Sequence, residues 1–567
     1  MKFIFRFVSA KASLTLLLVL LVNSLPAQHA RRMVAEWEPA VGTLIRWPLG
    51  IPSGLVVELA TDDSLFVLVE SYYERDQAIS DFTSWGVNMN HCRFIFAATY
   101  SHWTRDWGPH YVFDEAGVAG IADPMFNGYP WVPGCNSEHD RNPKGPGTKG
   151  WEEDDAVNAV LADSFNCPLI SLPIYLTGGN IMVDGHSTAV STQQMLDESY
   201  PICDEECFRE MAEDSLGISN YIITDNPEIY GIQHIDCYAK FLDEETILVK
   251  EVPDWHPEYD CVEELAHQLM NEVSCYGRPY EIVRVFCDSY GGNDVAAYTN
   301  SLILNKKVLV PLFGIGSDQQ ALDTYSEAMP GYEVVGFDYN SWYYYDALHC
   351  RTMGIFDRWM LRIVHKPLND EVQVDPNLQI VAMIDDRSET GLIPDELLLH
   401  WREEGGTSWN LSTMVPATGL DSFAASLPQQ VPGKVIEYYI SAADSSGRSE
   451  TLPRTAPEGC YSFTFIDTIT GIREEPGNML FLNLQPAVFR GSVSIVFGGP
   501  AGETALLTVY DITGNRRSVL YKGILTSEDE FVVWDGKDDK GHDLAPGMYI
   551  IRLRTSGALV VRKCLIM

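Results

Sequence analysis

The sequence predicts an α/β region followed by two small all-β units. Between residues 33 and 367, short β-branched and aromatic runs alternate with helical stretches, which is typical of an α/β domain. After Lys366 the runs become short and strand-like, and turns of Gly, Ser, Asp and Pro separate them. Since 567 residues exceed what one hydrophobic core usually supports, we expect several domains.

Local patterns predict the elements of the α/β region. Runs of β-branched, aliphatic and aromatic residues predict strands over 65–70, 246–250 and 307–311. Apolar residues at helical spacing predict a helix over 260–273. We assign this region, residues 28–367, as the catalytic-sized domain.

Two β-rich units follow. Strand-like runs over 378–384, 437–442 and 461–466 fit an immunoglobulin-like β-sandwich at 370–466. A charged stretch with Gly and Pro over 470–478 separates it from the chain end. Four further runs predict a second β-sandwich at 479–567: 493–497, 504–511, 531–534 and 548–554.

The first residues read as an export signal. Lys2, Arg6 and Lys11 precede an apolar run over 14–22 and a small-residue stretch that ends at Ala27. The apolar run is shorter than the roughly 20 residues that span a bilayer. We therefore expect a signal peptide at 1–27, no membrane span, and a secreted or cell-surface bacterial protein.

Charge and cysteine content limit the partners and the cross-links. Thirty-nine basic against 79 acidic residues give a net charge of -40. This charge argues against nucleic acid and anionic membranes as partners and favours cationic substrates. The alternative is that the charge serves only solubility. Twelve cysteines in an exported chain allow a few disulfides. Cys203 with Cys207, or Cys261 with Cys275, are candidate pairs.

Four short polar stretches carry the chemistry: 103–109, 234–237, 298–300 and 347–352. In an extended backbone, His234 and Asp236 would point to the same face, so that both could meet one substrate. Such a pair alone is more often structural or half of a metal site. The pair indicates a catalytic site only if a nucleophile lies beside it.

Cys350 is the candidate nucleophile. His349 and Arg351 flank it and could favour its thiolate, whereas a buried inert cysteine is the plain alternative. Asp106 and Asp236 supply what a planar guanidinium cation needs, since carboxylates accept its N–H donors in bidentate pairs.

Together these stretches resemble the guanidino-group-modifying enzymes, specifically agmatine deiminase and the Porphyromonas-type peptidylarginine deiminases, over about residues 33–366. By this resemblance Cys350 is the nucleophile and His234 the general acid and base. Asp106 and Asp236 are the two carboxylates that bind guanidinium. Asn300 is the motif asparagine before the strand at 302–311. These five form the expected catalytic set.

The resemblance also implies substrate contacts, a fold and a mechanism. Trp103 would be an aromatic wall, and Asn180 belongs to a Gly-Gly-Asn turn at 178–180 that is followed by Asp184. The implied fold is a pentein, with five ββαβ-like units around a pseudo-fivefold axis. In the implied reaction the Cys350 thiolate attacks the guanidinium carbon, ammonia leaves, and water hydrolyses the thiouronium to a ureido group. No cofactor or metal is required.

A second resemblance concerns the last hundred residues. The stretches 534–536 and 547–549, followed by Arg562, Lys563 and an apolar end, resemble the C-terminal sorting domains of type IX secretion. This implies that the export machinery is a partner of the C-terminal domain.

The substrate is left open among guanidino compounds. The exported, multidomain architecture and the stretch 346–352 look most like the peptidylarginine deiminases, so an arginine-containing peptide is the main expectation. However, 125–130 lacks the two arginines that would grip a terminal carboxylate, and Arg141 is out of register, so free arginine and agmatine remain open. Other readings are an inactive surface adhesin, an amidinotransferase and a dihydrolase.

Overall fold

A computed structural model describes residues 30–135, 150–200, 202–375, 378–427, 431–466 and, with short gaps, 480–566. The signal peptide expected at 1–27 and Arg141 lie outside the described residues. The chain divides into two compact units, 1–467 and 468–567. Each unit is described by itself.

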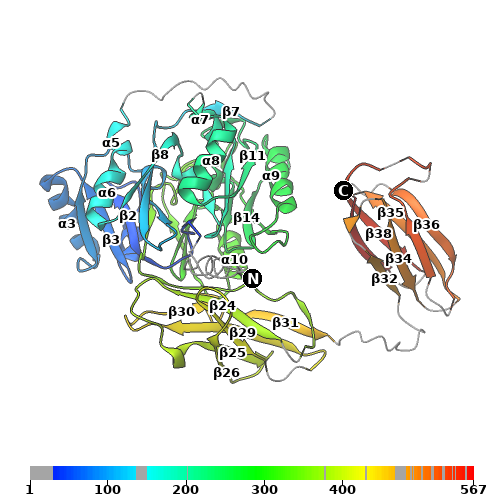
Figure 1. The fold of residues 1–567 in the computed structure, drawn as a ribbon. Coiled ribbons are helices and arrows are strands. Elements are labelled where there is room, and N and C mark those ends of the chain that lie inside the picture. The colour runs from blue at the N-terminus through cyan, green and yellow to red at the C-terminus, as the bar shows by residue number, and fades with distance from the viewer. Residues whose placement is uncertain are drawn as a thin grey trace, which may run out of the picture. The chain divides into compact units, whose positions relative to one another are not determined.

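Within the described residues 32–364, five small sheets share one strand order (Figure 1). In one of them, β13 (Ala239–Phe241) pairs antiparallel with β14 (Thr246–Glu251), and after helix α9 (Tyr259–Asn271) the chain returns as β15 (Glu281–Phe286), parallel to β14. An antiparallel pair followed by a helical crossover to a parallel strand is therefore the building unit.

The other four sheets repeat this order. Two of them consist of β18 (Leu302–Leu304), β19 (Lys307–Leu312), α10 (Asp318–Ala328) and β20 (Glu333–Asp338), and of β9 (Met182–Val183), β10 (Thr188–Thr192), α7 (Gln194–Ser199), α8 (Glu205–Leu216) and β11 (Asn220–Thr224). A third consists of β5 (His110–Phe113), β6 (Ala119–Met125), α5 (Glu152–Asp155), α6 (Val157–Phe165) and β8 (Leu169–Tyr175). The fourth consists of β21 (Met353–Phe356), β2 (Ala40–Arg46), α2 (Ser53–Leu59) and β3 (Ser64–Val69). Two sheets gain an edge strand: β1 (Arg32–Met33) beside β5, and β4 (Cys92–Phe96), after α3 (Tyr72–Trp85), beside β3.

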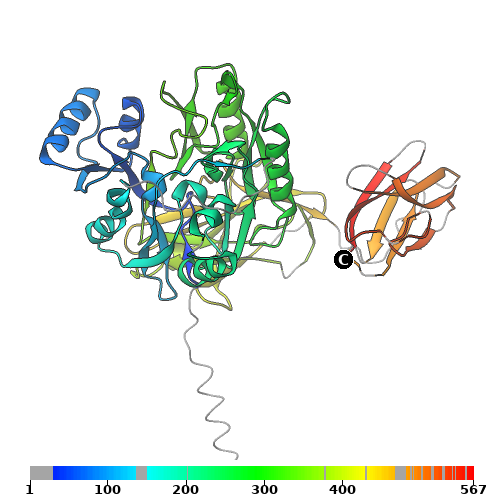
Figure 2. The same ribbon diagram turned by 90° about the horizontal axis from the view of Figure 1, so that it is seen from above.

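Apolar patterning explains why these residues form this unit. Strand β14 has buried side chains at Ile247, Leu248 and Val249, as expected for a strand covered on both faces. Helix α9 buries Val262, Leu265, Ala266 and Leu269, one stripe at helical spacing, in the same core. Figures 1 and 2 show α3 and α9 on opposite flanks of this part.

The all-β part of the first unit consists of two sheets around one core. Its strands are β22 (Leu361–Val364), β24 (Gln379–Asp386), β27 (Val415–Pro416) and β28 (Ser422–Ser426) in one sheet, and β23 (Glu371–Gln373), β25 (Leu398–Glu403), β26 (Asn410–Thr413), β29 (Val435–Ala443), β30 (Ser449–Leu452) and β31 (Tyr461–Ile466) in the other. Because β22 pairs with β24, β-structure of this part begins before residue 370.

The second unit is also built from two sheets, which enclose a core that includes Phe497, Leu507 and Trp534. Its strands are β32 (Phe481–Gln485), β34 (Val493–Gly498) and β37 (Glu530–Trp534) in one sheet, and β33 (Val488–Phe489), β35 (Thr504–Asp511), β36 (Arg516–Ile524), β38 (Gly547–Arg554) and β39 (Leu559–Ile566) in the other. All four runs predicted here form strands.

Two local predictions are wrong. The strand expected over 302–311 is a hairpin of β18 and β19, because Asn305 adopts a left-handed conformation and turns the chain. A disulfide does join Cys203 and Cys207, but Cys261 pairs with Cys135 rather than with Cys275, whose thiol is free. The true partner is 126 residues away in the sequence, so spacing could not reveal it.

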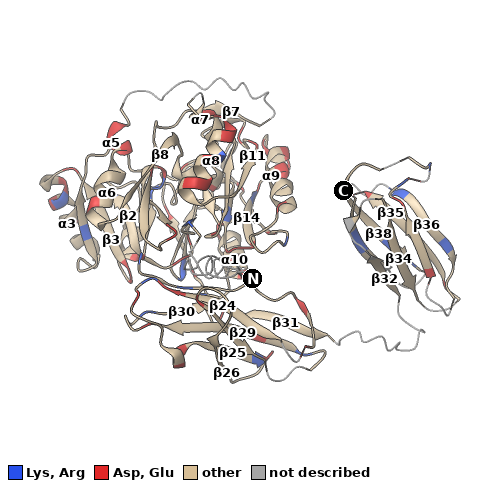
Figure 3. Ribbon diagram, in the orientation of Figure 1, with Lys and Arg blue, Asp and Glu red and all other residues tan. Residues whose placement is uncertain are grey.

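Acidic side chains are spread over the surface of the first unit rather than gathered in one place. Figure 3 shows Asp and Glu on α5, α7, α8 and α9. Within the part of the chain that the structure describes, no helix combines the length and apolar character needed to cross a membrane.

Candidate active site

A cavity of about 510 Å³ in the first unit contains the predicted nucleophile. Cys350, Asp106 and Trp103 line it. Its other side chains are mainly aromatic: Tyr129, Trp131, Tyr339, Tyr343 and Tyr345. The cavity therefore combines a thiol and a carboxyl group with walls suited to an alkyl chain or a cation.

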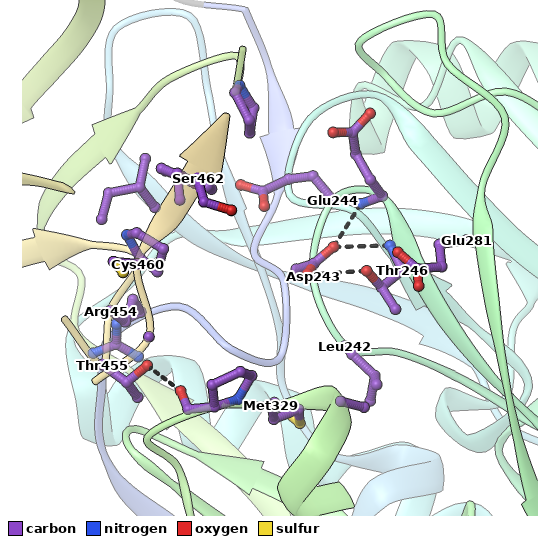
Figure 4. Close-up of a pocket in the computed structure, with 18 of the residues that line it drawn as sticks. Leu242, Asp243, Glu244, Thr246, Glu281, Met329, Arg454, Thr455, Cys460 and Ser462 are labelled. Carbon is purple, nitrogen blue, oxygen red and sulfur yellow. Dashed lines mark hydrogen bonds between the residues drawn. The ribbon is translucent and has the colours of Figure 1, made fainter. Parts of the chain in front are cut away.

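A second cavity, of about 580 Å³, lies where the α/β and all-β parts of the first unit meet (Figure 4). None of the seven predicted site residues is among the described residues that line it. Asp243 closes a local turn there by accepting hydrogen bonds from Thr246 and Glu245. We therefore place the chemistry in the smaller cavity.

Short turns at strand ends, from all five sheets, bring the predicted residues together. Asp106 lies in the one-turn helix α4 (Thr104–Trp107), and Cys350 precedes β21. Asp236 lies in a 3-10 turn, η2 (Ile235–Cys237), which His234 precedes. The extended backbone predicted for His234 and Asp236 is thus wrong, because the chain turns there to lead into β13.

Asn300 holds the nucleophile in place. Its Nδ2 lies 3.2 Å from the Cys350 Sγ, and its Oδ1 accepts hydrogen bonds from the backbone N–H groups of His349, at 2.9 Å, and Cys350, at 3.3 Å. The backbone N–H of Arg105 also donates to the Cys350 carbonyl, at 3.1 Å. Asn300 therefore positions Cys350 and acts through it.

The Cys350 thiol holds its proton in the substrate-free site. The neighbouring Cys237 lowers the pKa of Cys350, but burial and the carboxyl groups of Asp236, Asp106 and Asp346 outweigh this and raise it to about 12. Arg351 interacts electrostatically with Cys350, as expected, but this attraction does not outweigh burial and the three carboxyl groups. Its guanidinium is held by Asp346, with N···O distances of 2.8 and 2.7 Å.

Asp106 is the more easily protonated of the two carboxyl groups. Its Oδ2 accepts a hydrogen bond from the Tyr129 hydroxyl at 2.7 Å, and its Oδ1 accepts one from the Gly179 N–H at 2.9 Å. Burial, followed by the charge of Asp236, raises the pKa of Asp106 well above its ordinary value. A cation that enters between Asp106 and Asp236 would relieve this repulsion.

Asp236 is kept ionised by a chain of buried charges. Burial alone would raise the pKa of Asp236, but the hydrogen bond and charge of His349 hold it below its ordinary value. His349 Nδ1 lies 2.7 Å from Asp236 Oδ2, and its Nε2 lies 2.6 Å from Glu36 Oε2. Because both ring nitrogens face carboxylate oxygens, only the doubly protonated ring satisfies both. Lys240, 3.0 Å from Glu36, extends the chain.

His234 is placed to accept a proton. Burial lowers the pKa of His234 to about 4, so the ring is neutral in the free site. Its Nδ1 lies 3.7 Å from Asp106 Oδ1 and has no hydrogen bond within the described residues. A methyl group on Gly179 would lie 2.6 Å from Asp106 Oδ1, 2.8 Å from His234 Nδ1 and 3.2 Å from Asp236 Oδ2. The three side chains therefore converge on Gly179, which must lack a side chain.

Asn180 differs from its predicted role. Like His234, Asp236 and Asn300, it is not among the described residues that line the cavity. Its Oδ1 accepts hydrogen bonds from the N–H groups of Thr192 and Ile235, both at 3.1 Å. It therefore fixes the turn that carries Asp236 instead of touching substrate. Trp103 does line the cavity, and its ring packs edge-on against Tyr129.

Sequence patterns did not single out Glu36, Lys240 or the hydrogen-bond role of Tyr129. None stands in a motif with a recognisable chemistry, and Glu36 acts on His349 across 313 residues of sequence. The alternation of buried charges with opposite sign becomes visible only in three dimensions.

The site combines a buried thiol of raised pKa with two nearby buried carboxyl groups, an arrangement suited to a planar cation. That arrangement suits hydrolases that break C–N bonds of guanidino groups, and the protein is of this class. The model of the Porphyromonas-type peptidyl-arginine deiminase family matches residues 32–355, and the chain belongs to this family.

The chain is also similar to individual relatives and solved structures. The agmatine deiminase of Medicago truncatula is 25% identical over 365 residues, which make up 56% of this chain and 93% of the relative. An X-ray structure described as "putative agmatine deiminase" has a TM-score of 0.50 and 21% identity, covering 57% of this chain and 96% of that one, and thus shares the fold. Agmatine deiminase of Enterococcus faecalis has 20% identity and a TM-score of 0.49, with coverages of 59% and 99%.

The two-carboxylate arrangement predicts the effects of single substitutions. Asp106→Asn and Asp236→Asn should each lower kcat/KM by more than about a hundredfold, because a developing or bound charge loses its partner. Asp184→Asn should lower it by less than about tenfold, since Asp184 only closes a turn by accepting from His186 and Thr188. Steady-state kinetics of the three purified variants measure kcat/KM, and equal losses in all three would contradict the two-carboxylate arrangement.

Proposed function

We propose that this protein is an agmatine-type deiminase, which hydrolyses the guanidinium group of a small cation without a carboxylate and yields a ureido product and ammonia. The observation that carries the proposal is the cavity itself. Two carboxyl groups lie beside the Cys350 thiol, and the one Arg or Lys among the described lining residues, Arg351, is fully engaged.

The lining of the cavity disfavours a substrate carboxylate. Arg351 donates to both oxygens of Asp346 and also to the carbonyl oxygens of Gly50, at 2.6 Å, and Ser341, at 2.7 Å. Burial lowers the pKa of His102 to about 4, so this ring is neutral. A free carboxylate would thus meet no available cation among the described lining residues, whereas aromatic rings attract the ammonium end of agmatine. The agmatine deiminase relatives support the same substrate.

The reaction follows from the charges. The substrate cation, held by Asp236 and Asp106, stabilises the Cys350 thiolate, and neutral His234 takes up the proton that the thiol releases. Sulfur attacks the guanidinium carbon, and His234 then protonates the departing ammonia. In the second half, His234 deprotonates water, which attacks the thiouronium carbon, and the C–S bond breaks to give the ureido group.

Arginine within a peptide is the second candidate, and the mouth of the cavity favours it. Tyr343 is 44% exposed and stacks on Tyr345, with ring centroids 5.8 Å apart. Such a pair can carry a peptide backbone across the opening, and an internal arginine brings no carboxylate of its own to this site.

A substrate panel separates these candidates. Purified protein is incubated with agmatine, free arginine and a peptide with internal arginine, and ammonia and ureido product are measured. We expect the highest kcat/KM with agmatine and the lowest with free arginine. The matched control is Cys350→Ala, which should release no ammonia. Ammonia from the control, or none from any substrate with the wild-type chain, would refute the proposed function.

The shifted pKa values also predict a pH dependence. The pKa values of Asp106 and Cys350 are raised, the latter to about 12, so both groups are more protonated in the free site than ordinary Asp and Cys groups. Since substrate binding must displace these protons, kcat/KM should rise with pH from weakly acidic to weakly alkaline conditions. In Asp106→Asn the slope should be shallower. A profile that falls over this range would be incompatible with the mechanism.

We also propose that the five sheets are the blades of a pentein propeller and that both all-β parts are immunoglobulin-like. The shared order of antiparallel and parallel pairing supports the first, and the paired sheets around single cores support the second. A crystal structure in which the five sheets are not related by a pseudo-fivefold axis would overturn this.

Export is a further proposal. The signal-like residues 1–27 and the sorting-domain resemblance near the C-terminus support secretion or surface attachment through a type IX pathway. In the native host, the protein outside the cell should begin near Gln28, as N-terminal sequencing will show. A chain that stays inside with its first residues intact would argue against it.

A further inference from the structure

A second buried thiol lies beside the nucleophile and has no part in the reaction. Cys237 follows Asp236 in η2 and is fully buried. Its Sγ lies 3.5 Å from Asp236 Oδ1, while the Cys350 Sγ lies 3.7 Å from Asp236 Oδ2. One ligand atom from each of Asp236, Cys237 and Cys350 fits within 4.8 Å of the others.

These separations are close to those of a tetrahedral metal site. With Zn–S bonds of about 2.3 Å and Zn–O bonds of about 2.1 Å, the edges of a tetrahedron are roughly 3.8 Å between sulfurs and roughly 3.5 Å between sulfur and oxygen. The two observed S···O distances, 3.5 Å to Oδ1 and 3.7 Å to Oδ2, run to different oxygens of Asp236, and one oxygen with the two sulfurs forms a triangle whose sides are at most 4.8 Å. Small side-chain movements would therefore complete three ligands of a four-ligand site.

The surroundings supply what metal ligands need. Asn300 Nδ2 lies 3.2 Å from the Cys350 Sγ and 3.8 Å from the Cys237 Sγ, so it can donate to both sulfurs. His349 orients Asp236 through the 2.7 Å contact described above. Cys350 faces the 510 Å³ cavity, which gives a small ion a path inward and leaves the fourth position open to solvent.

The negative charge beside the two thiols also favours a bound cation. The Asp236 carboxylate lies next to both sulfurs, 3.5 Å from the Cys237 Sγ and 3.7 Å from the Cys350 Sγ, and supplies a negative charge to a bound ion. A divalent ion would displace one proton from each thiol to solvent as two metal–sulfur bonds form, and two thiolates would balance its charge. Thiolate ligands select soft or borderline cations over Mg²⁺ and Ca²⁺.

We propose that Asp236, Cys237 and Cys350 form a binding site for one thiophilic divalent cation, such as Zn²⁺ or Cd²⁺, which inhibits the enzyme by occupying its nucleophile. The binding stands on the geometry alone. The inhibition rests on the proposed function.

Cd²⁺ titration of the full chain tests the binding without any substrate. Free thiols are counted first, and thiolate-to-metal absorption in the ultraviolet is then followed. We expect one Cd²⁺ per chain for which Cys237→Ala and Cys350→Ala each weaken binding by more than about tenfold. The matched control is Cys287→Ala, which removes a fully buried thiol that lies outside the cluster and should leave this binding unchanged.

A second variant guards against a folding defect. Cys237→Ser keeps the size of the side chain, and circular dichroism shows whether each variant is folded. A folded Cys237→Ser or Cys237→Ala protein that binds Cd²⁺ as tightly as the wild type would overturn the site. So would a wild-type chain without the absorption, or one whose mass shows Cys237 already joined to Cys350.

Inhibition is measured with Zn²⁺, and each variant is compared with its own metal-free rate. The wild type and Cys287→Ala should lose activity at the same Zn²⁺ concentration, while Cys237→Ala should need at least about ten times more. Equal sensitivity of Cys237→Ala would overturn the inhibitory role. A chain that binds Cd²⁺ through Cys237 but releases no ammonia from any guanidino substrate would refute the proposed function and leave the metal site intact.

Discussion

The repulsion between two buried carboxyl groups beside one buried thiol governs this site. Asp106 and Asp236 face the same space as Cys350, and within the described residues no cation lies between them. Their opposite pKa directions follow from their partners, since Asp236 has His349 behind it and Asp106 has only the neutral donors Tyr129 and Gly179. In the proposed mechanism the arriving guanidinium completes the balance of charge, so that substrate binding itself activates the thiol.

The scaffold serves this balance by bringing separate chain turns to one point. Each turn lies at a strand end of a different sheet, and backbone contacts rather than long side chains set the spacing. Gly179 shows how tightly the site is packed, because His234, Asp106 and Asp236 converge on the place that a side chain at this residue would occupy. Glu36 contacts both His349 and Lys240, and this network of charges holds Asp236 in place through His349.

Sequence reasoning located the chemistry better than the architecture. Cys350, His234, Asp106 and Asp236 were singled out because each stands in a short polar stretch whose side chains suit a guanidinium ion, and the structure places the four close together. The shared order of the five sheets was implied by the family resemblance alone, because it resides in strand pairing and no sequence repeat expresses it. Asn180 was assigned to substrate although it holds a turn, and Glu36 was missed, since both depend on distances between remote parts of the chain.

Pairing of β2 with β21 joins the beginning of the α/β part to its end. Glu36, just before β2, reaches His349, just before β21, so the charge network spans nearly the whole of this part. During synthesis Glu36 is made long before His349, so the contact between them forms only after nearly the whole α/β part has been made. A chain that ends before residue 349 lacks this contact, the β2–β21 pairing and the Cys350 thiol together.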